Sequence, residues 1–526
     1  MISALAWIKK GAAKQFPDKY NLSEEEYQRI SSLTEQQVND AKEDLNNALK
    51  NENAEIKDES MATDKPANKN DDDDELAEYN LDDYDNEVKN ERGPQIFSNL
   101  AGLTYYSNNK EDPYITLDDA EDEKEEMNEL EILPTDNLLI TAKTEDDISH
   151  LEIYTYIEEE DNLYIHHDIM LPSFPLCVEW LDFKLGRKAN EPGTGNYVAV
   201  GTFDPTIEIW DLDTVDAMYP DVILGENKKR GKKNKNKNKN NGKINNERHT
   251  AAVMGLSWNK THRNLLASSS ADTTVKLWDI QTAQCMHSYN HHKDKVQAVQ
   301  WNPAETTVLL TGSYDKRVCC FDSRSPQAVS EWGLTADVEC LKWNPHQPEL
   351  FYVSTEDGLV KCFDARTSQS KELFTLQAHD GPVSALDVNP LIRDCIMTGS
   401  VDKQVRIWNI ANNQPSCVIS RNLDVGKVFS ASFSLDSPFL AAVSGSKGKV
   451  AIWNTVDNAT VRNTFGDRIS NLPETTNTTN NVEKSEVVTL PDDKEPESDS
   501  EEGEGANDDE KGMDVDEEDE DEEDDE

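Results

Sequence analysis

The sequence predicts an all-β protein: a seven-bladed WD40 β-propeller with disordered acidic tails and a short N-terminal helical arm. Two observations carry this prediction. A motif ending in an aromatic residue followed by Asp or Asn recurs through the middle of the chain. Apart from one gap of 68 residues, which contains a Lys/Asn-rich insert, its copies are spaced by 42–45 residues, as is typical of propeller blades. The net charge of −52 is concentrated outside this repetitive part, so the middle has the composition of an ordinary folded domain.

Each repeat opens with a segment of the form V-x-x-[LV]-x-[WF]-N-P and closes with an aromatic residue. The closing aromatics are Trp210, Trp278, Phe321, Phe363, Trp408 and Trp453. The matching opening positions hold Trp180, Trp258, Trp301, Trp343, Val388 and Phe433. Short apolar runs alternate with turns rich in Gly, Asp and Asn, as four antiparallel strands require. One such sheet cannot bury both of its faces, whereas a closed ring of sheets buries them and protects the edge strands.

Six repeats are clear, and a seventh, degenerate one precedes them. Residues 137–156 match the middle pair of strands but lack the tryptophan of that pair. We expect 127–134 and 163–171 to be the outer and inner neighbours of this pair, and 114–117 is a further candidate for closing the ring. The propeller is therefore placed at residues 125–466.

Polar residues recur in register with the aromatics. His249, Ser270, Asp272 and Trp278 stand in the order that WD-repeat blades use for a hydrogen-bonded tetrad, and His379, Ser400, Asp402 and Trp408 repeat it. A partial third set comprises His292, Ser313, Asp315 and Phe321. Ser, His and Asp also form the catalytic triad of hydrolases. Because the trio recurs once per repeat and no G-x-S-x-G elbow is present, we interpret it as structural and predict no catalytic residue.

Two pairs of adjacent histidines, His166–His167 and His291–His292, are the candidates for a metal site. Neighbouring residues of a strand point to opposite faces of the sheet, so neither pair suits a single ion. The acidic tail has no EF-hand spacing, and neither glycine-rich nucleotide motif occurs. The sequence thus predicts no metal, no cofactor and no small-molecule substrate.

The composition indicates the kind of cellular compartment in which the protein is expected. The eight cysteines are scattered with no CxxC pair, as expected of reduced thiols in a reducing compartment. No apolar stretch approaches the ~18–20 residues that span a bilayer, so no membrane partner is expected. In the first residues the apolar run precedes the lysines, which reverses the order of a secretory signal.

Four residues are candidate partner contacts. Phe203, Tyr314 and Lys447 lie in or next to the turn that holds the aspartate in other repeats, and in propellers this turn borders the central channel. Trp7, with Leu5 before it and Lys9 after it, belongs to a short apolar and basic peptide. We expect this peptide to dock onto a partner and not to form part of the core.

Charged appendages flank and interrupt the repeats. Residues 1–54 are predicted to be a partner-docking arm, with a capping box at Ser23–Glu26 that starts a short helix. An acidic, mostly disordered linker follows at 55–124, and a disordered acidic tail at 467–526. This tail holds Ser498 and Ser500, which precede acidic residues and are candidate phosphosites. Such a tail either keeps the protein soluble or screens basic clients.

A basic loop at 228–243 interrupts the repeats between the second and third blades. Its candidate nuclear-import or RNA-phosphate patch comprises Lys228, Lys229, Arg230, Lys232 and Lys233. Lysines without interleaved aromatic residues attract the nucleic-acid backbone but do not distinguish bases. A simple solvated loop is the alternative.

These features together resemble the periodic tryptophan protein 1 family. The resemblance rests on the N-terminal ISALAWIKKGAAKQFPDKYNLSEEEYQRI, the degenerate unit containing LLITAKTEDDISHLEIY, the W-N-P repeats, the basic loop and the acidic tail. It implies a non-enzymatic protein of the nucleus and nucleolus. Its partners would be pre-ribosomal proteins and pre-rRNA, and its role would be maturation of the large ribosomal subunit.

Two alternatives remain beside this scaffold hypothesis. The first is a chromatin- or histone-binding propeller acting at ribosomal DNA, in which acidic segments meet basic histone tails. The second is an enzyme-associated adaptor, such as a substrate receptor of a ubiquitin ligase. No adaptor-docking motif is recognisable in the sequence, so the adaptor ranks last.

Overall fold

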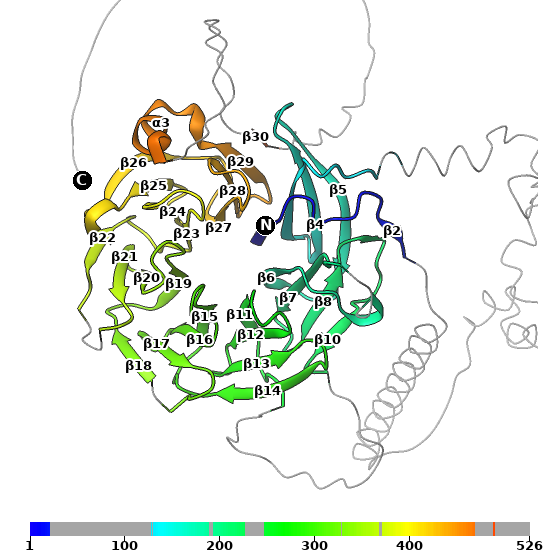
Figure 1. Ribbon diagram of the computed structural model, residues 1–526, viewed down its shortest axis with the longest axis horizontal. Helices are drawn as coiled ribbons and strands as arrows, with labels where there is room; N and C mark the ends of the chain where they lie inside the picture. The colour runs from blue at the N-terminus through cyan, green and yellow to red at the C-terminus, as the bar shows by residue number, and fades with distance from the viewer. Residues whose placement is uncertain are drawn as a thin grey trace, which may run out of the picture. The chain divides into compact units, whose positions relative to one another are not determined.

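In the computed structural model of the chain, seven four-stranded antiparallel sheets among the described residues stand around a common centre (Figure 1). The structure describes residues 1–20, 128, 130–188, 193–226, 247–327, 329–367, 371–468 and 488–489. We number the sheets as blades 1 to 7 in the order in which their middle strands follow along the chain. The predicted seven-bladed propeller is confirmed.

The strands of each blade run outward from the centre of the ring. Blade 1 consists of β1 (Ile2–Ile8), β3 (Asn137–Glu145), β4 (Ile148–Ile157) and β5 (Asn162–Leu171). Blade 2 consists of β6 (Pro175–Leu181), β7 (Tyr197–Thr202), β8 (Ile207–Asp211) and β10 (Val222–Leu224). Blade 3 consists of β11 (Val253–Trp258), β12 (Leu265–Ser270), β13 (Val275–Asp279) and β14 (Gln284–Tyr289). Blades 4 and 5 consist of β15 (Val296–Trp301), β16 (Val308–Ser313), β17 (Arg317–Asp322) and β18 (Val329–Gly333); and β19 (Val338–Trp343), β20 (Leu350–Thr355), β21 (Leu359–Asp364) and β22 (Phe374–Gln377). Blades 6 and 7 consist of β23 (Ala385–Val388), β24 (Cys395–Gly399), β25 (Val405–Asn409) and β26 (Ser416–Arg421); and β27 (Val428–Phe433), β28 (Leu440–Gly445), β29 (Val450–Asn454) and β30 (Val488–Thr489).

The innermost strands contact one another in a closed circle, with β1 between β27 of blade 7 and β6 of blade 2. A recurrent hydrogen bond links neighbouring blades along this circle. The backbone N–H of Trp258 donates to Glu179 Oε1 at 3.1 Å, and the N–H of Trp343 donates to Gln300 Oε1 at 3.2 Å. The N–H of Phe433 likewise donates to Asp387 Oδ2 at 2.8 Å. In each case the acceptor is the residue just before the opening aromatic position of the preceding blade.

The apolar core lies between adjacent sheets. One cluster joins Ile140 of β3 to Val198 of β7 and Trp210 of β8, and similar clusters fill the other interfaces between blades. The middle strands are buried on both faces, as in β7, whereas the outer strand β22 alternates between buried and exposed residues. This is the burial expected when every sheet packs face to face against two others.

The N-terminal segment corrects the sequence prediction. Trp7 was expected to contact a partner, but it is only 4% exposed, and its indole N–H donates to the backbone O of Ser432 at 3.1 Å. Residues 2–8 form β1, the innermost strand of blade 1, so the predicted propeller boundary at 125 and the docking role of residues 1–54 are wrong for this segment. The expected neighbours of 137–156 are also corrected: 163–171 lies in the outermost strand, and the described part of 127–134 contains no strand.

Short elements complete the ring. The two-residue strands β2 (Asp18–Lys19) and β9 (Thr214–Val215) pair in parallel and fasten the segment after β1 to blade 2. Five short helices are described: η5 (Gly186–Lys188), η6 (Ala411–Asn413), η7 (Thr455–Asp457), α3 (Ala459–Phe465) and η8 (Gly466–Arg468). The predicted helix after Ser23, the linker at 55–124, the candidate strand at 114–117, and positions 469–487 and 490–526 of the predicted tail lie outside the described residues.

Candidate functional site

Three of the candidate contact residues lie at one rim of the ring. Phe203, Tyr314 and Lys447 occupy the turns between the second and third strands of blades 2, 4 and 7. Phe203 is 58% exposed, whereas Tyr314 is half-buried beneath Lys295, whose Nζ lies 5.8 Å from the ring centroid. Lys447 is exposed and pairs with Asp424. We call this end of the ring the turn face. It also carries the connections between consecutive blades.

The tetrads lie just beneath the turn face, in blades 3 and 6. In blade 3, the indole N–H of Trp278 donates to Ser268 Oγ at 2.8 Å, and Ser268 Oγ lies 2.7 Å from His249 Nε2. The other ring nitrogen, His249 Nδ1, lies 3.0 Å from Asp272 Oδ2. Blade 6 repeats the chain through Thr398, and blade 4 keeps its histidine, threonine and aspartate but has Phe321 in place of tryptophan.

The direction of the hydrogen bonds follows from the donors available. Because the indole of Trp278 is only a donor, the hydroxyl of Ser268 accepts from it and donates its own proton to Nε2 of His249. His249 is then neutral, with its proton on Nδ1 directed at Asp272. Burial lowers the pKa of His249 and favours this neutral form. Burial alone would raise the pKa of Asp272, but the hydrogen bond from His249 holds it below its usual value.

The tetrad prediction was wrong in one member. The hydroxyl comes from Ser268 and Thr398, not from Ser270 and Ser400. Ser270 Oγ instead accepts the backbone N–H of Asp272 at 3.1 Å, and Ser400 Oγ accepts that of Asp402 at 3.2 Å, so both serines shape the turn. A hydroxyl residue stands at both positions in the repeats, and only the pairing of strands shows which one faces the histidine.

Blades 1 and 2 use carboxylates instead of histidine. In blade 1, Glu152 Oε2 accepts from Tyr154 Oη at 2.7 Å, and Glu152 Oε1 pairs with Lys143 Nζ at 3.1 Å. Burial alone would raise the pKa of Glu152, but hydrogen bonds from His150 and Tyr154, and the charge of Lys143, hold it below its usual value. In blade 2, Glu208 accepts from the indole N–H of Trp210 at 3.2 Å, and burial raises the pKa of Glu208 to about 7.

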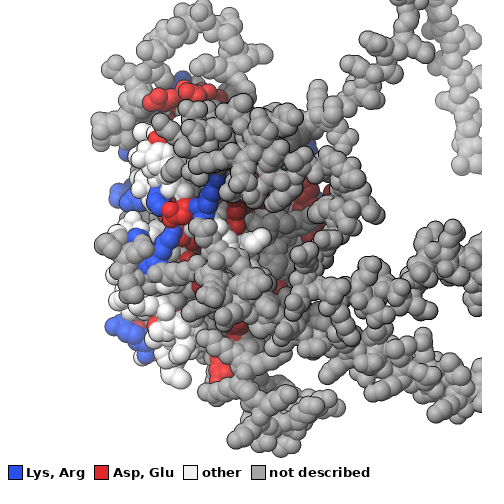
Figure 2. Space-filling model, turned by 90° about the vertical axis from the view of Figure 1, so that its right-hand side faces the viewer, with Lys and Arg blue, Asp and Glu red and all other residues white. Residues whose placement is uncertain are grey.

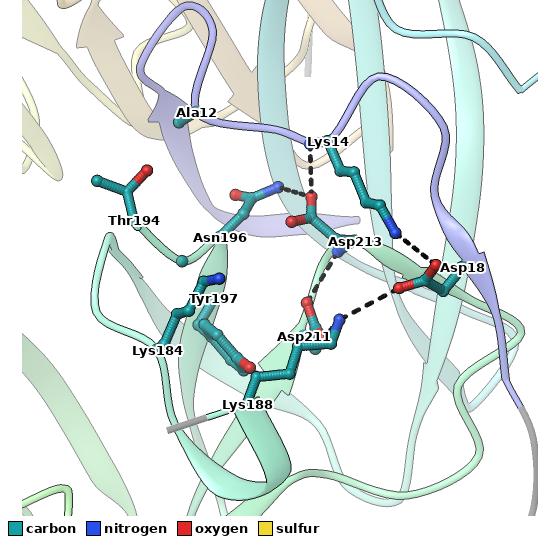
Figure 3. A pocket seen from close by; sticks show the side chains of 11 residues that line it. Ala12, Lys14, Asp18, Lys184, Lys188, Thr194, Asn196, Tyr197, Asp211 and Asp213 are labelled. Atoms are coloured by element: carbon teal, nitrogen blue, oxygen red, sulfur yellow. Dashed lines mark hydrogen bonds and ion pairs between the residues drawn. The ribbon is translucent and has the colours of Figure 1, made fainter. Parts of the chain in front are cut away.

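A polar cavity of about 390 Å³ lies where the segment after β1 crosses blade 2 (Figure 3). Asp213 accepts from Asn196 Nδ2 at 2.8 Å and from the backbone N–H of Lys14 at 3.0 Å, and Lys188 pairs with Asp211 at 2.6 Å. The lining contains three lysines and three aspartates. Its charges are balanced, so the cavity is better explained as a junction that anchors residues 9–20 than as a ligand site.

The first of the two histidine pairs, His166–His167, makes hydrogen bonds within the protein. His166 Nδ1 lies 2.7 Å from His167 Nδ1, and His166 Nε2 lies 3.1 Å from the backbone O of Leu130, so both atoms are engaged within the protein. No group of three or more His, Cys, Asp or Glu residues in the described part of the chain could hold a metal ion. Within the same part, no helix has the length and apolar character needed to cross a membrane.

Several predicted residues are not placed. The basic patch (Lys228, Lys229, Arg230, Lys232 and Lys233) and the candidate phosphosites (Ser498 and Ser500) lie outside the described residues. The described neighbours of the basic patch are Glu226, which follows β10 of blade 2, and Glu247, which precedes β11 of blade 3. Both belong to the connection between these blades on the turn face.

The closed ring of blades, the sequence repeat and the buried tetrads together define a WD40-repeat β-propeller. Two family models match parts of the chain: residues 237–304 match the Anaphase-promoting complex subunit 4 WD40 domain, and residues 370–409 match the WD domain, G-beta repeat. Each match covers one or two blades and shows the repeat class alone.

Longer matches show the family. The chain is 36% identical to Periodic tryptophan protein 1 of Saccharomyces cerevisiae, covering 90% of this chain and 91% of that protein. It is 32% identical to the Periodic tryptophan protein 1 homolog of Drosophila melanogaster, covering 88% and 96%. An uncharacterized WD repeat-containing protein of Schizosaccharomyces pombe is 44% identical, covering 89% and 92%. The chain belongs to the periodic tryptophan protein 1 family.

Proposed function

We propose that this protein is a non-catalytic scaffold in ribosome biogenesis. It helps to assemble large-subunit pre-ribosomes and supports pre-rRNA processing in the nucleolus. The observation that carries the proposal is family membership over almost the whole chain, with 90% of it aligned to Periodic tryptophan protein 1 of Saccharomyces cerevisiae. The role itself is the one that the N-terminal and repeat resemblance implies for this family.

The arrangement of the polar residues supports a scaffold over an enzyme. His249 is 1% exposed and Ser268 is fully buried, so the Ser-His-Asp groups of blade 3 do not meet a substrate. Their hydrogen bonds are all made within the blade. A closed ring of this kind holds the turns at its rim with little loss of conformational entropy on binding.

The basic loop supports contact with RNA. It belongs to the connection between β10 and β11, whose described residues Glu226 and Glu247 lie on the turn face. Lysines of this kind neutralise phosphates and release counterions, which makes binding strongly dependent on salt. Contact through the loop is accordingly expected to show little base preference.

Affinity purification of the tagged full-length protein from nuclear extract tests the proposal. The eluate is expected to contain pre-rRNA and large-subunit proteins, and RNase treatment is expected to release them. A variant with 228–243 replaced by a Gly/Ser linker of equal length should retain less RNA at moderate salt, with an unchanged thermal midpoint. Nucleosomes without pre-rRNA in the eluate would contradict the proposal and favour the chromatin alternative.

A further inference from the structure

We propose that the turn face of blades 6 and 7 binds the phosphate backbone of RNA. The contact is made by four lysines, which we call the lysine sector: Lys403, Lys427, Lys447 and Lys449. The inference rests on the proposed function, which makes RNA a partner of the protein. It adds a contact surface on the propeller itself to the one expected at the basic loop.

The lysine sector comes from three segments that follow one another along the rim of the ring. Lys403 lies in the turn between β24 and β25 of blade 6, and Lys427 ends the connection from β26 to β27. Lys447 and Lys449 lie in the turn between β28 and β29 of blade 7. All three segments belong to the turn face.

Backbone hydrogen bonds join these segments into one surface. The N–H of Val428 donates to the O of Ser400 at 3.2 Å, which ties the connection to the turn of blade 6. The N–H of Ser446 donates to the O of Lys427 at 2.9 Å, which ties it to the turn of blade 7. Gly426 has a φ of +78°, and a Cβ there would collide with Ser446 Oγ, so glycine is required at this approach. The lysines therefore stand on a fixed base, which keeps the cost of ordering low on binding.

Positive charge prevails over the lysine sector although the whole protein is acidic. Residues 403–454 contain six Lys and Arg against two Asp. Asp436 lies between β27 and β28 at the opposite end of the ring, which leaves Asp424 as the carboxylate of this range on the turn face. Just before the range, Asp402 belongs to the tetrad of blade 6, and Asp380 is exposed in the connection from blade 5.

The charges of the lysine sector are accessible to a ligand. Lys403, Lys427 and Lys447 are exposed. Among the described residues, neither Lys403 nor Lys427 forms an ion pair. Lys447 pairs with Asp424, but both side chains are open to solvent, and such pairs contribute little to stability. A phosphate group can therefore take the place of the carboxylate.

The composition of this surface fits RNA better than it fits a protein partner. Exposed polar side chains, Asn422 and Ser446, accompany the lysines, and amide and hydroxyl groups commonly contact phosphate and sugar oxygens. Among the described residues of blades 6 and 7, the turn face carries no exposed large apolar side chain. Protein interfaces centre on apolar anchors, whereas nucleic-acid interfaces are more polar and more positively charged.

Acidic turns bound the lysine sector on both sides. In blade 5 the turn between β20 and β21 exposes Glu356 and Asp357, and in blade 1 the turn between β3 and β4 exposes Asp146 and Asp147. On the flank that carries β4, β5 and β8, the visible Lys and Arg side chains intermingle with Asp and Glu, at the left of Figure 2. An RNA strand is therefore expected to contact the rim of blades 6 and 7 and to avoid the neighbouring blades.

A titration of the full-length protein with RNA tests the inference. The probe is a labelled single-stranded RNA of about 20 nucleotides, and its binding is followed by fluorescence anisotropy at several salt concentrations. The titration is made with the parent protein and with the variant that carries a Gly/Ser linker at 228–243. The second protein removes the contribution of the basic loop.

The combined substitutions Lys403→Gln, Lys427→Gln and Lys447→Gln are expected to weaken RNA binding by about 10-fold in both proteins. They should also lower the slope of log affinity against log salt by about 2, because each lysine paired with a phosphate of a single strand contributes ~0.7. The unfolding midpoint should stay that of the parent protein, since all three side chains are exposed.

A matched triple variant removes the same charge from exposed residues at the opposite end of the ring: Lys260→Gln, Lys371→Gln and Arg393→Gln. It should bind RNA as the parent protein does. A photoreactive uridine in the RNA should label peptides that contain 401–404, 422–427 or 446–449. Equal loss of affinity in both triple variants, or labelling confined to other blades, would overturn the inference.

A polyglutamate peptide distinguishes RNA from an acidic protein segment. If it binds as tightly as the RNA and loses affinity in the lysine-sector variant, then the surface accepts carboxylates and the assignment to RNA is wrong. Each of these negative results would leave the proposed function intact, because co-purification of pre-rRNA is measured separately from binding of the probe RNA.

Discussion

Single hydroxyl groups connect the tryptophan of a blade to its histidine. Ser268 accepts from Trp278 and donates to His249, and Thr398 does the same between Trp408 and His379. In blade 4, Thr311 reaches His292 while Phe321 has no donor to offer. The role of these residues could not be deduced from the sequence, because Ser270, two positions later on the same strand, has the same chemistry. Strand register alone separates a residue that completes the tetrad from one that shapes the turn.

Replacing Ser268 by alanine is expected to destabilise the propeller by about 1–3 kcal/mol, because the buried Trp278 N–H loses its acceptor and His249 loses its donor. Thermal or denaturant unfolding measures the loss. Ser325→Ala, at an exposed serine, is the control and should leave the midpoint unchanged. Equal midpoints for both variants would show that the tetrad hydroxyl contributes nothing to stability.

Glu208→Gln is expected to stabilise the protein at pH 8 but not at pH 5. Burial raises the pKa of Glu208 from 4.5 to about 7. The unfolded state therefore ionises first as the pH rises, and stability is lost between about pH 4.5 and pH 7. Glutamine keeps an acceptor for the indole of Trp210 without the buried charge. The measurement is the difference in unfolding midpoint between variant and parent at each pH.

Glu305→Gln, at an exposed carboxylate, serves as the control for the charge change. It should shift the midpoint equally at both pH values. A Glu208→Gln effect independent of pH would mean that Glu208 is ionised in the folded protein throughout this range.

At the scale of single elements, the N-terminal strand is the main departure from the sequence prediction. β1 matches the first strands of the other blades in burial pattern and in its bulge after the first residue. Trp7 donates to the carbonyl of Ser432 as Trp301 donates to that of Ser257. Trp7 thus occupies the opening tryptophan position of blade 1. The signal was present, since Ile2 to Trp7 fits the opening motif, but more than 120 residues separate it from its blade.

Trp7→Ala is expected to cost about 3–5 kcal/mol, the range for removing a large buried aromatic side chain. Trp7→Phe should recover most of the packing while losing the hydrogen bond to Ser432. Thermal unfolding of the two variants beside the parent protein measures both effects. A Trp7→Ala protein as stable as the parent would instead support an exposed docking peptide.

At the scale of the whole molecule, different blades are stabilised by different polar networks. Among the described residues, histidine–aspartate networks occur in blades 3, 4 and 6, while blades 1 and 2 rely on the carboxylates of Glu152 and Glu208. The number of blades and their middle strands were predictable, because aromatic residues recur at a fixed period. The way in which the ring closes could not be predicted, because closure joins strands from the two ends of the folded domain. A local sequence pattern carries no information about which distant strands pair.

Hydrogen exchange in the Trp7→Ala variant tests whether the ring opens locally around β1. Amides of β6 and β27, which flank β1, are expected to exchange faster than in the parent protein, whereas those of β19 across the ring should change less. Uniform acceleration in all blades would show that the ring opens only as one cooperative unit.

The position of β1 has a consequence for biosynthesis. Its neighbours β27 and β28 are translated more than four hundred residues after it, which corresponds to roughly 20–80 s at 5–20 residues per second. Throughout that interval the nascent chain carries an apolar heptapeptide, ISALAWI, and the strands of blade 7 that will pack against it have not yet been made. Until the last blade emerges, this segment lacks its neighbours β27 and β28, and we expect mistakes of strand exchange between chains there before anywhere else.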